Sequence, residues 1–494
     1  MSMKRGLVRG AFSLGGARAV TSAFNAVALL ILARLLTPHD FGVAAIASAV
    51  LYFIVSLTQF SIYQALVQRS EVEQEHIDTA WSIALIRSLT IVAFFVLASW
   101  PLALLYDDPE MLSVFMVVGL TGGVMGLYNP HIVLAQKGMR FAPMALFQLC
   151  RCVGLVAVVI LAIIFRSFWA IIIGNLIGAA LASLISYVMI PYRPRFTLAR
   201  FRDLWGFSGW LFLNQLCETI NWRFDQLAIS VLVPKAQMGI YAIAYSLAII
   251  PTRETIQPLR EILFPGLANL TNDRPRLTRA FVRAQSSMAA ISTPLALGLA
   301  LVAEPAVMVM LGPQWSEAAV FVQIFAVTSA IGAFVSCTAS AAMALGATRV
   351  VFLQQFWTLM ARVPLVLAGL HFYGLVGAAL AGLLSEIILA TISLRFVRSL
   401  LGLPIFQQLR MHWSTLLSLA VMSASVLAAE LLVNPTFEAN IVRFILLVLV
   451  GGVAYVGTNL ALWAAGGRKE GPVHELIDIA AQMVPARFKA VGPA

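Results

Sequence analysis

The sequence predicts an all-α integral membrane protein. About fourteen apolar runs of roughly 20 residues cross the chain, and one run of that length spans the hydrocarbon core of a bilayer as a helix. The 494 residues are 61% hydrophobic and only 11% charged, far outside the range of soluble globular proteins. The positive residues between the runs fall mainly in alternate loops, as in multi-pass proteins. These observations leave no room for a separate soluble domain.

The predicted transmembrane helices follow one another with short connections. They cover residues 12–33, 42–65, 80–105, 111–135, 143–165, 168–190, 206–233, 237–262, 284–303, 317–344, 350–371, 374–396, 413–433 and 441–464. The pair 284–303 and 317–344 is the least regular, because the apolar segment between them contains Pro305 and Pro313.

The Lys and Arg residues of the short loops set the orientation. About 22 of the 33 lie in the loops and tail on the side of the N-terminus. The opposite loops hold only Arg34, Arg166, Lys235 and Arg443. Both termini are therefore predicted to be cytoplasmic. The net charge of +11 follows from this topology, so we expect no nucleic-acid partner.

The chain also repeats itself. The segment LLTPHDFGVAAIASAV (35–50) resembles VLVPKAQMGIYAIAYSL (231–247), with a proline-to-glycine turn that leads into a helix of small residues. The spans 168–189 and 372–393 resemble each other at a similar offset. Two pseudo-symmetric six-helix lobes in the same orientation follow from this repeat. The predicted parts are an N-lobe (1–190), a cytoplasmic linker (191–205), a C-lobe (206–400), helices 13 and 14 (401–466) and a cytoplasmic tail (467–494).

Charged residues inside the spans are the main functional signal, because a charge in hydrocarbon is costly and usually faces a wet cavity. Arg18 and Arg87 lie about two turns from a cytoplasmic end and can also snorkel into head groups. Arg151, Arg253 and Arg362 lie near mid-depth, where the alternative is a structural ion pair.

Polar residues also form stripes at helical spacing, which predicts faces that point inward. The stripes are Arg18, Ser22 and Asn25; Tyr52, Ser56, Gln59 and Tyr63; Asn214, Glu218, Asn221 and Asp225; Arg253, Gln257 and Arg260; and Gln355 with Arg362. Packing between helices explains one or two such stripes, whereas five favour a polar cavity.

A basic cavity with amide and aromatic side chains suits a pyrophosphate that carries sugars, since arginine presents a planar fork of donors to phosphate. The candidate substrate-binding residues are Arg18, Asn25, Gln59, Arg87, Arg151, Arg253 and Arg362. Glu218, Asp225 and Glu386 are expected to balance these charges or to carry protons or Na⁺ for coupling. No cofactor and no metal site is expected.

No enzyme signature competes with a transport function. The six histidines are scattered without a metal-binding spacing, and no phosphate-binding glycine loop occurs. Asp107-Asp108 resembles the acidic pair of a lipid-dependent glycosyltransferase, but the outer loops are short. The four cysteines all lie in apolar runs, which favours small core residues over disulfides.

Several stretches together resemble the polysaccharide-transport family of the multidrug/oligosaccharidyl-lipid/polysaccharide exporter superfamily. They are ILARLLTPHDFGVAAIA (31–47), SIYQALVQRSEVEQEHIDTAW (61–81), LAQKGMRF (134–141), FDQLAISVLVPKAQMGIYAIAYSLAIIP (224–251) and LFPGLANL (263–270). The colanic-acid and succinoglycan exporter group is the most similar. The resemblance covers roughly residues 5–400.

This resemblance implies two six-helix lobes that form a V and open alternately to either side of the bacterial inner membrane. It implies an undecaprenyl-pyrophosphate-linked oligosaccharide as substrate, flipped to the outer leaflet, with a polymerase and a chain-length regulator as pathway partners. By helix and depth, Arg18 and Arg253 match cavity arginines of the family, and Asp225 matches its acid. Helices 13 and 14 resemble the extra pair of fourteen-helix members.

Two other functions remain open from the sequence. A drug/cation antiporter of the same superfamily would have a net acidic cavity, whereas this chain has more arginines than carboxylates in its spans. A membrane-embedded polysaccharide polymerase or ligase would carry its arginines in large outer loops.

Overall fold

The computed structural model describes residues 2–58, 66, 72–132, 141–201, 209–432 and 440–465. Within these ranges the regular structure is entirely helical. The chain divides into two compact units, Met1–Ile243 and Ala244–Ala494. The division falls inside helix α11 (Lys235–Ala268). The all-α class is confirmed.

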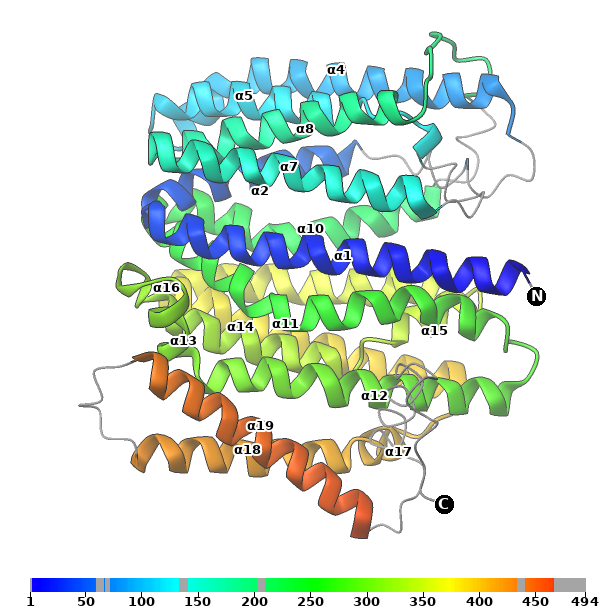
Figure 1. Cartoon of the computed structure of the whole chain (residues 1–494), viewed down its shortest axis with the longest axis vertical. Helices are drawn as coiled ribbons and strands as arrows, with labels where there is room; N and C mark the ends of the chain where they lie inside the picture. The colour runs from blue at the N-terminus through cyan, green and yellow to red at the C-terminus, as the bar shows by residue number, and fades with distance from the viewer. Residues whose placement is uncertain are drawn as a thin grey trace, which may run out of the picture. The chain divides into compact units, whose positions relative to one another are not determined.

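The helices of the first unit run side by side along a common direction (Figure 1). They are α1 (Ser2–Leu35), α2 (Pro38–Leu57), α4 (Gln74–Leu105), α5 (Glu110–Met125), α7 (Phe141–Phe165), α8 (Trp169–Met189) and α10 (Gly209–Leu232). Helix α7 packs between α1 and α8, α5 packs between α4 and α8, and α10 packs against α2. The core between α1 and α7 consists of Leu32 and Leu36 against Val158 and Ala162, all buried.

The second unit continues with shorter helices between long ones. They are α12 (Arg274–Leu301), α13 (Ala303–Met310), a 3₁₀ turn (Pro313–Trp315), α14 (Ala318–Ala333), α15 (Thr338–Ala344), α16 (Thr348–Leu401), α17 (Ile405–Arg410), α18 (Trp413–Leu432) and α19 (Asn440–Ala465). Helix α16 consists of two helices that meet at Gly374, whose φ of 60° and ψ of −145° suit glycine alone. The predicted spans 350–371 and 374–396 lie on either side of this joint.

Each predicted span overlaps a helix of the described chain. Eight helices in the described ranges are long and apolar enough to cross a membrane, and three further apolar helices are shorter. Fourteen crossings, like the lobe boundaries, therefore remain predictions.

The predicted span 317–344 is interrupted between α14 and α15, and Gln285 of α12 fills the gap. The Gln285 amide donates from Nε2 to the Ala333 carbonyl at 2.9 Å, and its Oε1 accepts from the Cys337 backbone N–H at 2.9 Å. Gln285 is only 1% exposed. One side chain thus supplies partners for a carbonyl and an N–H at the break, alongside the turn hydrogen bonds of residues 334–338, as buried backbone groups require.

The predicted span 111–135 also ends early, because α5 stops at Met125. The buried Asn129 then bonds to the end of α8. Its backbone N–H donates to Ser186 Oγ at 2.9 Å and its Nδ2 donates to the Ile190 carbonyl at 2.7 Å. These bonds join the end of α5 to the end of α8.

After α8 the chain runs in an extended conformation along the start of α4 as far as Arg200; residues 191–200 are called the strap below. The Tyr192 hydroxyl donates to Asp78 Oδ1 at 2.6 Å, and the Thr197 N–H donates to Ser82 Oγ at 2.9 Å. Burial and the adjacent Asp78 carboxylate raise the pKa of the Tyr192 phenol, so it remains a donor. Asp78 and Ser82 are both buried.

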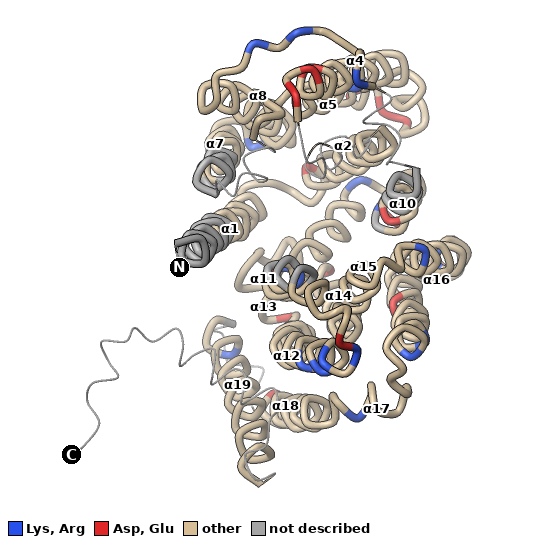
Figure 2. Tube along the Cα trace, turned by 90° about the vertical axis from the view of Figure 1, so that its right-hand side faces the viewer, with Lys and Arg blue, Asp and Glu red and all other residues tan. Residues whose placement is uncertain are grey.

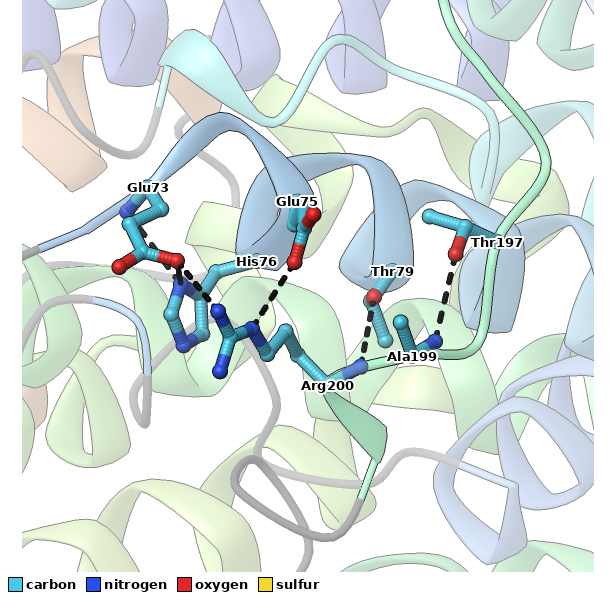
Figure 3. Close-up of polar contacts among 7 residues, drawn as sticks. All are labelled: Glu73, Glu75, His76, Thr79, Thr197, Ala199 and Arg200. Atoms are coloured by element: carbon cyan, nitrogen blue, oxygen red, sulfur yellow. Dashed lines mark hydrogen bonds and ion pairs between the residues drawn. The ribbon is translucent and has the colours of Figure 1, made fainter.

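Arg200 fixes the far end of the strap (Figure 3). Its Nη2 donates to Glu73 Oε2 at 2.8 Å, its Nε donates to Glu75 Oε2 at 3.0 Å, and its backbone N–H donates to Thr79 Oγ1 at 3.4 Å. The three charged side chains are more than a third exposed, so each ion pair contributes at most about 1 kcal/mol. The buried bonds of Tyr192 and Thr197 therefore hold the strap more than Arg200 does.

Candidate functional site

The two repeated turns of the sequence lie against each other at one end of the first unit. In the first turn Thr37 caps α2: Asp40 N–H donates to Thr37 Oγ1 at 3.3 Å, and Thr37 N–H donates back to Asp40 Oδ2 at 3.0 Å. Pro38 occupies the first helical position, where its missing N–H costs nothing. The other Asp40 oxygen accepts from the Phe168 N–H at 2.9 Å, which ties this turn to the start of α8.

The glycines of both turns stand at this contact. A Cβ on Gly42 would overlap the Lys235 carbonyl oxygen, and a Cβ on Gly239 would overlap the Pro38 carbonyl oxygen. The two turns therefore meet backbone to backbone, which only glycine permits at these positions. We call residues 37–42 and 234–239 the paired turns.

A charged pair and a hydroxyl pair flank the paired turns. Lys235 donates to Asp108 in the loop between α4 and α5, and the Tyr106 and Ser230 hydroxyls are 2.8 Å apart. Burial alone raises the pKa of Asp108, but the hydrogen bonds from Lys235 and the Glu110 N–H outweigh it and lower that pKa. Asp108 is thus a carboxylate that bonds to Lys235, which agrees with a structural role for this acid in the loop between α4 and α5.

Within the helices of the first unit, α10 carries the clearest polar group. The Arg223 guanidinium lies 4.9 Å from the centre of the Tyr52 ring on α2, and its Nη1 donates to Gln226 Oε1 at 2.9 Å. A cation over an aromatic face is stabilised by the ring quadrupole. Tyr52 belongs to a predicted stripe, but Arg223 was not among the candidate site residues. Its position in the sequence does not indicate this pairing, which depends on the packing of α10 against α2.

The predicted acids of α10 lie on the same helix. Asp225 is 5% exposed and Asn221, one turn earlier, is 4% exposed, whereas Glu218 is half-buried. Each of the three interacts with other groups of the protein. Asn221 and Asp225 thus lie on a buried face of α10, as the predicted polar stripe requires.

The other candidates of this unit are less informative. Arg87 is half-buried and its Nε donates to Thr58 Oγ1 at 3.4 Å, at the end of α2. Asn25 is exposed and its Nδ2 donates to the Thr21 carbonyl of its own helix at 2.8 Å. Gln59 and the side chains of Arg18 and Arg151 lie outside the described part of the structure.

In the second unit, Arg253 on α11 remains accessible. Its Nε donates to Glu254 Oε1 at 3.1 Å, and the two side chains are 44% and 35% exposed. A pair that is this exposed is not a dry, locked ion pair, so the guanidinium retains donors for a ligand.

Arg362 and Glu386 approach each other from the two halves of α16. Arg362 and Arg260 both lie near enough to the Glu386 carboxylate to interact with it electrostatically. Arg362 and Glu386 are half-buried, and Arg260 is exposed. We call Arg260, Arg362 and Glu386 the α16 charge group. Arg260 belongs to the predicted polar stripe that also contains Arg253 and Gln257.

The remaining charges lie mostly at helix ends. Figure 2 shows Lys and Arg concentrated near α12 and α17 and on the segment that follows α8. No three His, Cys, Asp or Glu side chains in the described ranges gather as metal ligands would. Each unit thus holds arginines and acids within apolar helices; that they share one cavity remains a prediction.

A family model described as "Polysaccharide biosynthesis protein" matches residues 31–320. The chain belongs to this family. The matched region includes both paired turns, α10 and Arg253, and it ends before α16.

Named relatives agree with this assignment. The chain is 26% identical to the succinoglycan biosynthesis transport protein ExoT of Rhizobium meliloti over 302 residues, which span 60% of this chain and 61% of ExoT. It is 22% identical to the lipopolysaccharide biosynthesis protein WzxC of Escherichia coli over 396 residues, 78% of this chain and 80% of WzxC.

Solved structures share the fold. A lipid II flippase, MurJ, in an inward closed conformation superposes with a TM-score of 0.76 at 14% identity, covering 91% of this chain and 98% of MurJ. An inward-facing multidrug resistance transporter of the MATE family gives 0.63 at 14% identity, covering 77% and 94%. The protein therefore has the fold of these multi-pass membrane transporters.

Proposed function

We propose that the protein flips undecaprenyl-pyrophosphate-linked oligosaccharide repeat units from the cytoplasmic to the outer leaflet of the bacterial inner membrane, for exopolysaccharide or lipopolysaccharide synthesis. The family assignment supports this function, as do the names of ExoT and WzxC. The observation that carries it is the presence of arginines with retained exposure inside apolar helices of both units. The protein then needs no enzymatic step.

A pyrophosphate head group explains why arginines occupy this depth. Arginine stays charged at any working pH and binds phosphate through two parallel hydrogen bonds. A buried charge is costly unless it is paired, so acids must balance the arginines when the substrate is absent. In the proposal, the charge of Arg362 is balanced by Glu386. The charge of Arg253 is balanced by Glu254. Glu218 and Asp225 are then the acids available for coupling to protons or Na⁺.

Alternating access requires a contact that closes the outer side while the cytoplasmic side is open. We assign this contact to the paired turns. They come from α2 and α11, and the predicted topology puts them on the outer side, with both termini in the cytoplasm. The Asp108–Lys235 pair holds the same contact from the loop after α4. Opening to the outside would separate Gly42 from Gly239.

The test is a leaflet assay for radiolabelled lipid-linked oligosaccharide in cells that carry single variants. Arg253→Ala and Arg362→Ala should each leave the labelled lipid in the cytoplasmic leaflet while the protein stays at normal abundance. Arg279→Ala is the matched control, because Arg279 is exposed near the start of α12 and donates to the Pro275 carbonyl of its own helix. Normal export in both cavity variants would remove arginines from the mechanism.

The same assay separates the other functions. A polymerase or ligase would leave its lipid-linked substrate in the outer leaflet when the protein is deleted. A drug/cation antiporter would leave the lipid distribution unchanged. Export that depends on a polymerase and a chain-length regulator would identify those proteins as pathway partners.

A further inference from the structure

Gly332 of α14 lies directly beneath the carboxylate of Glu386. A Cβ built on Gly332 would be 2.6 Å from Glu386 Oε1 and 3.5 Å from its Cδ. The first distance is shorter than real Cβ contacts, so the carboxylate occupies the space that a side chain at position 332 would take. Helices α14 and α16 pack against each other over this region.

The backbone gives no other reason for glycine at this position. Gly332 lies within the α-helix Ala318–Ala333, and its φ is not among the positive values that require glycine. A glycine inside a helix is destabilising relative to alanine. Its presence is therefore explained by the space that it leaves for Glu386.

We propose that Gly332 is a positioning residue: it seats the Glu386 carboxylate beside Arg362 and Arg260, and an anionic phosphate takes the place of that carboxylate on the two arginines. We call this placement of the Glu386 carboxylate by Gly332 the seat. It depends only on the geometry of α14 and α16. The exchange with phosphate rests on the proposed flippase function. A substrate phosphate has more acceptor oxygens than the carboxylate, so it can satisfy both guanidinium groups at once.

The test uses Gly332→Ala in the full-length protein, with Gly298→Ala as the matched control. Gly298 is also within a helix of the second unit, and a Cβ there would meet nothing within 4 Å. Both changes add the same methyl group and the same helix propensity, but only Gly332→Ala displaces the carboxylate. Because the displaced atom is the end of a flexible side chain, the variant should still fold.

The second variant is the double change Gly332→Ala with Glu386→Asp. Aspartate is one methylene shorter, so its carboxylate can withdraw from the new methyl group. We expect several-fold slower export for Gly332→Ala and for Glu386→Asp alone, and recovery toward the rate of Gly298→Ala in the double variant. A Gly332→Ala variant that exports like Gly298→Ala would overturn the proposal, and so would a double variant no better than Gly332→Ala.

A second measurement does not depend on transport. Inorganic pyrophosphate should raise the unfolding temperature of purified Gly332→Ala and Glu386→Gln more than that of Gly298→Ala, because both changes free the arginines from the carboxylate. If this shift is seen but deletion of the protein leaves the lipid distribution unchanged, Gly332 still positions Glu386 and the flippase function fails. If pyrophosphate raises the unfolding temperature of all three variants equally, Gly332 does not position Glu386, whatever molecule the protein transports.

Discussion

The paired turns make a quantitative prediction about the equilibrium between closed and open outer sides. Gly42→Ala places a methyl group on the Lys235 carbonyl oxygen, which is backbone and cannot move aside alone. Overpacking of this kind costs typically about 1–3 kcal/mol. If the turns touch only when the outer side is closed, the whole cost falls on the closed state. The open population should then rise about 5- to 150-fold.

Cysteine labelling measures this shift. Met238 lies within the paired turns and is fully buried, so Met238→Cys should react with a membrane-impermeant maleimide only when the turns separate. The experiment requires replacement of the four native cysteines. Gly298→Ala is again the control. Equal labelling rates for Gly42→Ala and Gly298→Ala would refute the assignment of the paired turns as the outer contact.

Three further predictions concern stability, each measured as the unfolding temperature of the purified protein. Asp108→Asn should lower the unfolding free energy by about 1 kcal/mol or less at pH 7. Because the folded pKa of Asp108 is lowered, this contribution exists above the ordinary aspartate pKa of about 3.9, and the difference from wild type should vanish as the pH falls through the folded value. Gln285→Leu removes the partner of the buried Cys337 N–H and leaves the Ala333 carbonyl with the long 3.5 Å bond from the Ser336 N–H, so it should cost about 1–3 kcal/mol, whereas a negligible effect would mean that the α14–α15 break is satisfied in another way. Burial lowers the pKa of His412 to about 4, so acidification from pH 6.5 to pH 4 should remove about 3 kcal/mol of stability, and His412→Phe should abolish that pH dependence.

The helices could be predicted from the sequence because hydropathy over 20 residues is a local property. The repeated proline-to-glycine turns were also visible, and the structure gives them a physical reason: Gly42 and Gly239 lie at one shared contact. The contact itself joins residues almost 200 positions apart, and the two similar segments alone do not specify it.

The polar partners inside the bundle could not be predicted in the same way. The interruption near residue 335 has no proline or glycine pair to mark it, and it depends on Gln285 from another helix. In the sequence, Gly332 does not differ from other small residues of membrane helices, and only the structure shows that the Glu386 carboxylate lies against it. Arg223 carries the same charge as Arg362, and only the packing of α10 on α2 assigns it to Tyr52. Such pairings arise from tertiary contact, which spacing along one helix does not encode.

The strap limits how far α10 can travel. Its buried bonds hold the chain to α4 up to Arg200, and α10 begins at Gly209. The nine Cα–Cα virtual bonds from residue 200 to residue 209 can span at most about 30 Å when fully extended. Extra residues inserted after Arg200 would lengthen the connection between Arg200 and α10. Residues inserted before Thr197 would instead bulge away from α4 and leave the length of this connection unchanged. The rate of the transport cycle should therefore respond to the first kind of insertion and tolerate the second.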